Sequence, residues 1–497
     1  MYGDKEVGRL DANAVTIDGY SKDDTLLKNI SSITQNIYAN MSADDFEISA
    51  KKTYGMEKRV GTKSADKAVR TVTKYEHPED KTQKDEQGNK NPEHDTMNQE
   101  NNPDKNDQTG TEEVSDPETK EHTEENTKES ENPGHTTAEK AGGQMEKFSL
   151  ETRIYAGAGA VSVLETFGAK RLLLVTDPYF MKNGTAERIA GLSGAAEIEY
   201  FDSVQPDPTV SLAAEGTAKL KQFQPDLLVA LGGGSAMDCA KAMAYFAQGR
   251  FPLVAIPTTS GSGSEVTNFA ILTHGKAKHP LVDERLRPSA AILDSDLLKE
   301  LPPGLIADSG FDVLTHGLEA YAATNAGAFS DMYARESFRM AYAVLPASYA
   351  GKQEVRLRMH LASTMAGIAF SHAGLGICHA ISHSLGGIFH VPHGRLNAVL
   401  LPGVIACNSS RVLHRYAELA RAAGMAGSAD AVAVRNLKNG LLRLRRQLDL
   451  PETLSQVGIP PVKIREELPR IVEAVLEDPC IRTNPVPVEE SVIRRIL

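Results

Sequence analysis

Residues 227–246, LLVALGGGSAMDCAKAMAYF, decide the fold of this 497-residue chain. The apolar run LLVAL is typical of a buried strand, the glycines form a tight connection, and a helix follows. Consecutive glycines let backbone N–H groups approach a phosphate closely, and a helix N-terminus favours an anion. Gly232, Gly233, Gly234 and Ser235 are therefore candidate phosphate-binding residues, with a purely structural turn as the alternative.

The alternation of strand and helix continues on both sides of this segment. We expect strands at 153–155, 171–176, 196–201, 227–231, 253–256 and 290–293, and helices at 185–192, 210–223 and 235–248. This rhythm is typical of a parallel sheet with helices on both faces. After about Leu301 the strand signals stop, and long Ala-, Leu- and Arg-rich segments predict an all-helical second half, with helices at 330–347, 354–370, 414–423 and 431–448.

Two further features lie at expected strand ends. The loop PTTSGSGSE (257–265) offers the hydroxyls of Thr258 and Thr259 at the carboxyl edge where the glycine run also lies. Asp177 ends an earlier strand, where a carboxylate can accept hydrogen bonds from the adenosine ribose and disfavour a 2′-phosphate, which selects NAD over NADP. An Asp-Pro turn is the alternative for Asp177. Together these loops predict a dinucleotide site.

The helical half carries a cluster of potential metal ligands. Asp312 and His316 are four residues apart, as are His379 and His383, so each pair shares one helix face. His390 and His393 follow. A lone helical histidine is usually an ordinary core or surface residue, but four within fifteen residues of an apolar stretch are costly to bury without a shared role. Carboxylate and imidazole donors predict a divalent cation site between helices.

Composition narrows the class of protein. The chain has 54 Lys and Arg against 66 Asp and Glu, a net charge of −12, which argues against nucleic acid or an anionic membrane as partner. Four widely spaced cysteines without a CxxC pair indicate a reducing compartment. The first residues lack the pattern of a secretory signal, and no run approaches the roughly 18 apolar residues of a membrane span. We therefore expect a cytoplasmic protein.

The first 144 residues differ from the rest. Residues 76–144 contain no Leu, Ile, Phe, Tyr or Trp, so we expect a disordered polar linker there. Within the N-terminal extension, 1–75, we expect an amphipathic helix at about 24–41 whose stripe consists of Leu26, Ile30, Ile33, Ile37 and Met41. This helix either packs on the body or itself, or docks on a partner. The alternatives are an inserted segment or a true start at Met145.

Several motifs from Met145 onward resemble one family. They are VTDP (175–178), ALGGGSAMDCAKA (230–242), IPTTSGSGSEVT (256–267), the Lys278 region, DVLTHGLEAY (312–321), AGIAFSHAGLGICHAISHSLGG (366–387), VPHGRLNAVLLP (391–402) and DPCIRTNP (478–485). In order and spacing they resemble the iron-containing (group III) alcohol dehydrogenases of the dehydroquinate synthase-like superfamily. They look most like the propanol dehydrogenases of propanediol-using microcompartments.

The resemblance implies a fold and a site. It implies an α/β NAD-binding domain at 145–300 and an all-α metal-binding domain at 301–497. The implied metal ligands are Asp312, His316, His379 and His393, for Fe²⁺ or alternatively Zn²⁺. His383 is implied near the substrate or in proton transfer. The implied NAD-binding residues are Asp177, Gly232, Gly233, Gly234, Ser235, Asp238, Thr258, Thr259 and Lys278.

The resemblance also implies an activity and a setting. The expected reaction interconverts a short primary alcohol and its aldehyde, with propanal to 1-propanol foremost. Butanol, ethanol, 1,3-propanediol and glycerol dehydrogenases, and a dehydroquinate synthase, are the alternatives. We expect a homo-oligomer, located in the cytoplasm within a bacterial microcompartment, with 24–41 binding a shell or cargo protein. The alternative from another class of function is an interaction or scaffold protein that acts through residues 1–75.

Overall fold

The computed structural model describes residues 147–497 except 250, 275 and 276. The expectations for 1–75, for its helix at 24–41 and for the linker at 76–144 lie outside the described residues. The strands are β1 (Arg153–Gly157), β2 (Arg171–Val175), β3 (Glu197–Phe201), β4 (Leu227–Gly232), β5 (Leu253–Pro257), β6 (Phe269–His274), β7 (Ala277–Val282) and β8 (Ala290–Asp294).

Helices connect the strands of the first half and make up the second half. Those of the first half are α5 (Pro178–Lys182), α6 (Thr185–Gly191), α7 (Val210–Phe223) and α8 (Gly234–Ala247), with 3-10 turns η2 (Ala160–Phe167) and η3 (Ser264–Val266). Those of the second are α9 (Pro303–Ala322), α10 (Ala328–Tyr349), α11 (Arg356–Ala373), α12 (Ile377–Phe389), α13 (His393–Ala422), α14 (Asp430–Gln447), α15 (Pro461–Glu477), turn η8 (Pro479–Thr483) and α16 (Glu490–Ile496).

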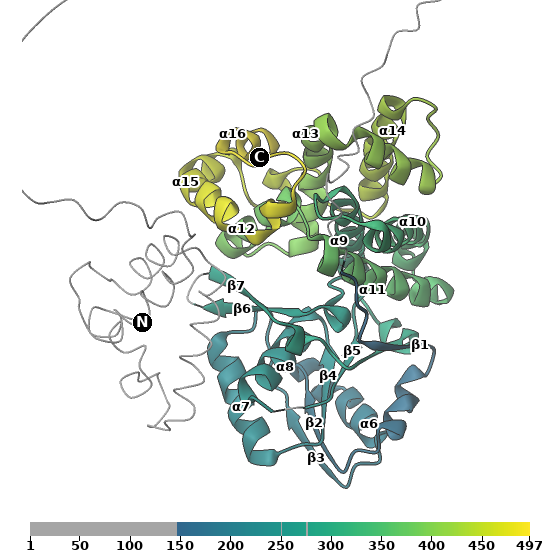
Figure 1. Cartoon of the computed structure of the whole chain (residues 1–497), viewed down its shortest axis with the longest axis vertical. Coiled ribbons are helices and arrows are strands. Elements are labelled where there is room, and N and C mark those ends of the chain that lie inside the picture. Colours follow the sequence, from purple (N-terminus) through teal and green to yellow (C-terminus); the bar gives the residue numbers. More distant parts are fainter. Residues whose placement is uncertain (1–146, 250, 275–276) are drawn as a thin grey trace, which may run out of the picture. The chain divides into compact units, whose positions relative to one another are not determined.

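Six strands form one parallel sheet in the order β1-β8-β5-β4-β2-β3. Alternate residues of β2 face opposite sides of it. Leu173 packs with α7 and α8 on one face, and Leu172 packs with η2 and α6 on the other. Figure 1 shows the sheet in its lower part with these helices around it. The predicted parallel α/β half is confirmed.

The glycine run forms the turn from β4 into α8. Gly232 has a φ of 151°, and a Cβ at this position would lie 2.7 Å from Cβ of Ala236, so only glycine fits there. Gly233 is the N-cap of α8 and provides no side chain to cap it. The first N–H groups of α8 are therefore exposed at the carboxyl edge of the sheet, as phosphate binding requires.

Two elements of the first half were not predicted, the five-residue helix α5 and a hairpin. β6 and β7 form an antiparallel hairpin that is separate from the main sheet. The apolar stretch FAIL (269–272) of β6 is short, and β7 contains Pro280, which is disfavoured in a central strand.

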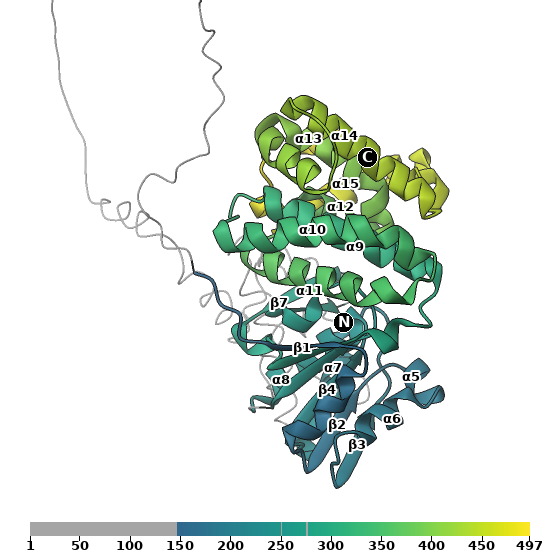
Figure 2. The same ribbon diagram turned by 90° about the vertical axis from the view of Figure 1, so that its right-hand side faces the viewer.

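The second half is all helical, as predicted. Helices α9, α10 and α11 pack side by side, and α13 packs against α9 and α14 (Figure 2). The helix expected at 414–423 is only the last part of α13, a 30-residue helix that contains Pro402 and a break at Val412. Those two residues interrupt the helical pattern, which explains why the sequence predicted only one segment. α15, which contains Pro469, was also not predicted.

By length and hydropathy α13 could cross a membrane, contrary to the expectation that no segment reaches this threshold. The α11 and α12 pair passes the same test only if its 105° bend is ignored. Half of the apolar window of α13 is buried, including Leu400, Leu401 and Val404 in the core of the helical half. The apolar character of α13 is therefore explained by core packing.

Helix α11 fastens the loop between β5 and β6 to the helical half. Thr364 donates a hydrogen bond to the buried Glu265 (2.6 Å), and Ser260 Oγ lies 2.9 Å from His360 Nδ1. Gly263 has a φ of 64° and lies so close to Gly367 that a Cβ would come within 2.7 Å of its Cα. This loop, the predicted second cofactor loop, is thus held by three contacts from one helix.

Candidate metal and cofactor site

Helix α9 presents three polar side chains on one buried face. Asp312, His316 and Glu319 follow one another at intervals of four and three residues, which is one face of a helix. His379 and His383 come from α12, and His393 is the first residue of α13. Three helices therefore supply the residues that the sequence predicted as metal ligands.

The structure places the three predicted histidine ligands around the fourth predicted ligand, Asp312. Its Oδ1 lies 3.5 Å from Nε2 of His393, 3.7 Å from Nε2 of His379 and 4.0 Å from Nε2 of His316. The ligand atoms of Asp312, His379 and His393 all lie within 4.8 Å of one another. The rings of His316 and His379 stack with centroids 4.5 Å apart. His390 lies apart, exposed at the C-cap of α12.

The hydrogen bonds around these side chains fit a cation. Asn397 donates its amide to Asp312 Oδ1 (2.7 Å) and lies 3.1 Å from His393 Nε2. A donor facing Nε2 assigns that atom its lone pair. On the other side of His379, Nδ1 lies 2.5 Å from Oε2 of the buried Glu319. A carboxylate on the far ring nitrogen directs Nε2 inward, as is typical of histidines that bind metals.

The pKa shifts of three of the four predicted ligands suit cation binding, and that of His379 opposes it. Burial lowers the pKa of His316 to about 3 and holds that of His393 well below its ordinary value. Burial opposes ionisation of Asp312, but the surrounding imidazoles outweigh it and lower the carboxyl pKa. For His379, burial is outweighed by the bonds to Asp312 and Glu319, which raise its pKa to about 9. The anionic Asp312 and the neutral His316 and His393 are donors that a divalent cation can bind, whereas His379 must first release a proton, so cation binding would displace that proton.

His383 lies next to these ligands but has a different partner. Its ring stacks on that of His393, with centroids 4.9 Å apart, and its Nδ1 lies 2.8 Å from Oδ2 of Asp478. Its side chain is 24% exposed, whereas that of His379 is 1% exposed. His383 is therefore partly accessible to solvent, as is His393 (30% exposed), and Asp478 fixes the orientation of His383.

The two predicted cofactor loops lie against each other. A Cβ on Gly233 would lie 3.5 Å from Oγ1 of Thr259, and one on Gly234 would lie 3.2 Å from Ser262. Asp177 Oδ1 caps α5 by accepting from Tyr179 N (2.9 Å), while its Oδ2 lies 3.8 Å from the Cβ position of Gly232. Asp177 therefore fits both predictions: its Oδ1 caps the helix after the Asp-Pro turn, and its Oδ2 lies beside the glycine run.

Three other predicted cofactor residues have partners within the protein. Asp238 accepts from Ser264 Oγ (2.7 Å) and from Ile271 N (3.1 Å), which joins α8 to η3 and β6. Lys278, on β7, forms an ion pair with Asp207 at 2.6 Å. Thr258 is buried and donates its backbone N–H to Gly232 O (3.0 Å). Asp238 and Thr258 therefore stabilise the two cofactor loops in addition to any contact with the cofactor.

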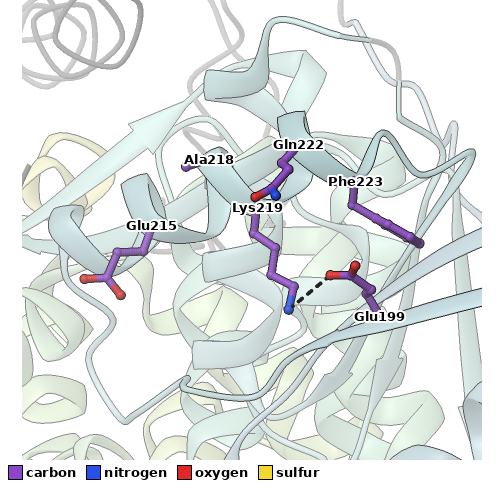
Figure 3. Close-up of a pocket in the computed structure, with 6 residues that line it drawn as sticks. All are labelled: Glu199, Glu215, Ala218, Lys219, Gln222 and Phe223. Atoms are coloured by element: carbon purple, nitrogen blue, oxygen red, sulfur yellow. Dashed lines mark ion pairs between the residues drawn. The ribbon is translucent and has the colours of Figure 1, made fainter. Parts of the chain in front are cut away.

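A surface hollow of about 370 Å³ lies elsewhere, on α7 and β3. Its lining includes the ion pair of Lys219 with Glu199 (3.2 Å) and the nearby Glu215 (Figure 3). It contains none of the predicted site residues, and its ion pair is solvent-exposed. We assign it no function.

Three residues of the site were not predicted from the sequence: Glu319, Asn397 and Asp478. Glu319 carries a signal that could have been used, because it continues the spacing of Asp312 and His316 by one turn. Asn397 follows His393 by four residues, also one turn. Asp478 lies 95 residues from its partner His383, so no local pattern indicates it.

Comparison with family profiles agrees with the fold. Residues 151–295 match the profile "Iron-containing alcohol dehydrogenase", and residues 306–497 match "Fe-containing alcohol dehydrogenase family, C-terminal". Together the two matches cover both halves of the chain from residue 151 onward and assign it to a class of oxidoreductases. The family resemblance seen in the sequence is thereby confirmed.

Individual relatives agree over nearly their whole length. The 1-propanol dehydrogenase PduQ of Salmonella typhimurium is 38% identical over 366 residues, which is 71% of this chain and 99% of the relative. The NADPH-dependent butanol dehydrogenase of Clostridium saccharobutylicum is 36% identical over 376 residues, 71% and 97% respectively. The chain belongs to the iron-containing alcohol dehydrogenase family.

Solved structures support the same assignment. An iron-containing alcohol dehydrogenase from Thermococcus thioreducens superposes with a TM-score of 0.65 at 35% identity, covering 70% of this chain and 98% of that one. A 1,3-propanediol oxidoreductase superposes with a TM-score of 0.67 at 30% identity, covering 71% and 100%.

Proposed function

We propose that the protein is an iron-dependent, NAD(H)-linked dehydrogenase that interconverts a short primary alcohol and its aldehyde. The observation that carries the proposal is the convergence of Asp312, His316, His379 and His393. Beside it lie the glycine turn and the hydroxyl loop that suit a dinucleotide. Zinc is the alternative metal.

In this proposal the chain's own residues prepare the donor set. Glu319 holds His379 by its Nδ1, and Asn397 holds the carboxylate of Asp312, so both are fixed before an ion binds. Lewis-acid polarisation of the substrate oxygen would come from the ion bound by these four side chains, and hydride from the dinucleotide.

The cofactor contacts follow from the sheet edge. The N–H groups at Gly233, Gly234 and Ser235 would bind the pyrophosphate, because the N-terminus of α8 attracts an anion. Asp177 Oδ2 would accept from the adenosine ribose hydroxyls and disfavour a 2′-phosphate. Thr259 lies against Gly233 and would contribute its hydroxyl to the same site. Lys278 would contact the cofactor at the outer edge of this site.

We assign His383 to proton transfer. It combines access to solvent with a fixed position beside the ligands, which is what a general acid or base needs. Asp478 holds Nδ1, so Nε2 is the ring nitrogen free to exchange a proton with the substrate oxygen, directly or through a water. Asp478 acts through His383 and is therefore a positioning residue.

For the substrate we propose propanal and 1-propanol. The 38% identity to PduQ, named a 1-propanol dehydrogenase, supports this choice. The 36% identity to the butanol dehydrogenase keeps butanol as the specific alternative, and it also raises NADPH as the alternative cofactor. Ethanol, 1,3-propanediol and glycerol remain to be compared in the same assay.

The test combines metal content with a substrate series. Purified protein is treated with a chelator, reloaded separately with Fe²⁺ and Zn²⁺, and assayed with NADH and NADPH on aldehydes from acetaldehyde to butanal. Oxidation of 1,3-propanediol and glycerol is measured with the oxidised cofactors. We expect chelation to abolish propanal reduction and Fe²⁺ to restore it. Full activity in His316→Ala and His379→Ala variants that still bind iron would refute the ligand set. Intact protein without any such activity would favour the scaffold hypothesis.

We further propose a cytoplasmic location inside a bacterial microcompartment, with residues 24–41 as the contact to a shell or cargo protein, and a homo-oligomeric enzyme. The basis is the PduQ relationship together with the apolar stripe in the sequence. Residues 1–75 fused to a fluorescent protein should form puncta in cells that assemble shells. A diffuse signal in those cells would refute the targeting role.

A further inference from the structure

A thiol lies beside the histidine that we assign to proton transfer. His383, Asp478 and Cys480 place ligand atoms within 4.8 Å of one another. None of these three side chains is part of the donor set around Asp312. A thiolate, an imidazole nitrogen and a carboxylate oxygen are the donors that zinc takes in proteins.

Existing bonds hold the three side chains in place. Asp478 Oδ2 lies 2.8 Å from His383 Nδ1, while its Oδ1 accepts from Cys480 N (2.8 Å) and caps the turn η8. Thr483 of that turn donates to Leu375 O (2.6 Å), just before the helix that carries His383. The turn and α12 are therefore fastened together, and an ion could bind without backbone rearrangement.

The cluster is also accessible. Cys480 is partly exposed, as are the side chains of His383 (24%) and Asp478 (12%). An ion can therefore enter from solvent and keep a water as its fourth ligand, which completes the tetrahedral coordination that zinc prefers.

We propose that His383, Asp478 and Cys480 form a second cation site, specific for a thiophilic divalent cation such as zinc, and that its occupation inhibits the enzyme. Binding releases the thiol proton of Cys480 to solvent. Nδ1 of His383 exchanges its hydrogen bond with Asp478 for a bond to the ion, and the proton of the neutral ring then resides on Nε2. Nε2 can then no longer accept a proton.

Binding and inhibition are separate claims. Binding depends only on the three side chains, whereas inhibition rests on the proposed role of His383 in the dehydrogenase reaction. A failure of the cobalt-binding experiment can therefore be distinguished from a failure of the zinc-inhibition experiment.

Binding is tested with cobalt as a spectroscopic substitute for zinc. Full-length protein whose first site is loaded with iron receives one further equivalent of Co²⁺. We expect a near-ultraviolet thiolate-to-cobalt absorption band, which the first site cannot produce because its four predicted ligands contain no sulfur. The band should be absent in Cys480→Ser and retained in the matched control Cys407→Ser. No band in the wild type, or an equal band in Cys480→Ser, would overturn the site.

Inhibition is tested by titrating Zn²⁺ into the iron-loaded enzyme during aldehyde reduction, with the iron content measured afterwards. We expect inhibition without loss of iron, and an inhibitory zinc concentration at least about tenfold higher in Cys480→Ser. Cys480→Ala provides a second variant if the serine variant does not fold. Equal inhibition of wild type and variant, or inhibition that follows iron loss, would overturn the inhibitory role. Absence of any reductase activity would refute the proposed function instead, and the cobalt band would still decide the site.

Discussion

At the residue scale, the candidate metal site depends on residues that would not themselves bind the ion. Asp312 and His379 are held by Asn397 and Glu319, which are both fully or almost fully buried. Glu319 also accepts the backbone N–H groups of Gly376 and Cys378, so it fixes the start of α12 as well as the ring of His379. Such support restricts a ligand to one orientation and raises its basicity.

Replacing Glu319 by Gln tests this support. The variant keeps the shape but removes the charge beside His379 Nδ1, so we expect iron affinity to fall about 10- to 100-fold. Competition with a chelator of known affinity measures the change. Glu418→Gln, which alters a carboxylate bonded to Tyr321 instead, is the control and should leave affinity unchanged. Equal affinity of Glu319→Gln and the wild type would contradict this role.

A second residue-scale prediction concerns cofactor choice. Asp177→Ser keeps a helix-capping side chain on α5 but removes the negative charge near the predicted ribose site. We expect the ratio of kcat/KM for NADPH to that for NADH to rise by about tenfold or more, because repulsion of the 2′-phosphate is lost. Asp202→Ser changes an exposed acid just after β3 and should leave the ratio as it is. An unchanged ratio in both variants would exclude Asp177 from cofactor selection.

At the element scale, α11 and the loop between β5 and β6 act as one unit. Gly263 and Gly367 make backbone contact, and the buried pairs Thr364 with Glu265 and His360 with Ser260 lie on either side of it. Close backbone contact leaves little freedom to move. The loop that carries Thr258 and Thr259 is therefore positioned by a helix of the other half of the molecule.

Adding one methyl group to this contact should loosen it. A Cβ at residue 367 would lie 2.7 Å from the carbonyl oxygen of Gly263 and 2.9 Å from Val266. We expect Gly367→Ala to lower the free energy of unfolding by about 1–3 kcal/mol and to raise KM for NADH. Gly191→Ala, where the new Cβ meets nothing within 4 Å, is the control in α6. Urea unfolding and steady-state kinetics measure both, and equal stabilities would refute the packing argument.

The buried His360 of α11 makes the folding stability of the protein depend on pH. Burial lowers the pKa of His360 from 6.5 to about 4. Between these values the unfolded chain binds a proton that the folded chain does not, so stability falls as the pH drops from 6.5 to 4. At pH 5 this amounts to about 2 kcal/mol for one such group.

His360→Gln should remove that contribution while leaving a partner for Ser260. Urea unfolding at pH 7 and pH 5 measures the loss of stability on acidification, which we expect to be smaller in His360→Gln than in the wild type. His372→Gln, at a partly exposed histidine on the same helix, is the control. An identical pH dependence of wild type and His360→Gln would show that His360 is not the titrating group.

At the scale of the whole molecule, the catalytic unit proposed here occupies the last seven-tenths of the chain. Relatives match 70–71% of this chain while 97–99% of their own length is covered, and the family profiles begin at residue 151. The residues before that point therefore have no counterpart in the matched regions.

A chain that begins at Met145 should retain the fold and the activity. We expect its melting temperature and its kcat/KM for propanal to equal those of the full chain, because the two family profiles match only residues from 151 onward. Calorimetry and kinetics on the two proteins provide the measurement. A clear loss of activity on truncation would assign residues 1–144 a part in catalysis.

The sequence was sufficient for most of the architecture. Apolar runs such as 227–231 and the glycines after them predicted the parallel sheet, because a strand buried on both faces must be apolar along its length. The β6 and β7 hairpin was missed because the apolar stretch FAIL (269–272) of β6 is short and β7 contains Pro280. Helix α13 was shortened because Pro402 and Val412 interrupt its pattern. Both misses occur where long-range packing outweighs local preference.

For the site, sequence determined the residue types and tertiary structure determined their partners. Spacings of four residues identified Asp312 with His316 and His379 with His383, since helical periodicity is local. The bonds of Glu319 to His379, Asp478 to His383 and α11 to the cofactor loop connect residues 60 to 99 positions apart in the chain. Only the folded chain brings such residues together, because no local spacing encodes a contact that depends on how whole helices pack.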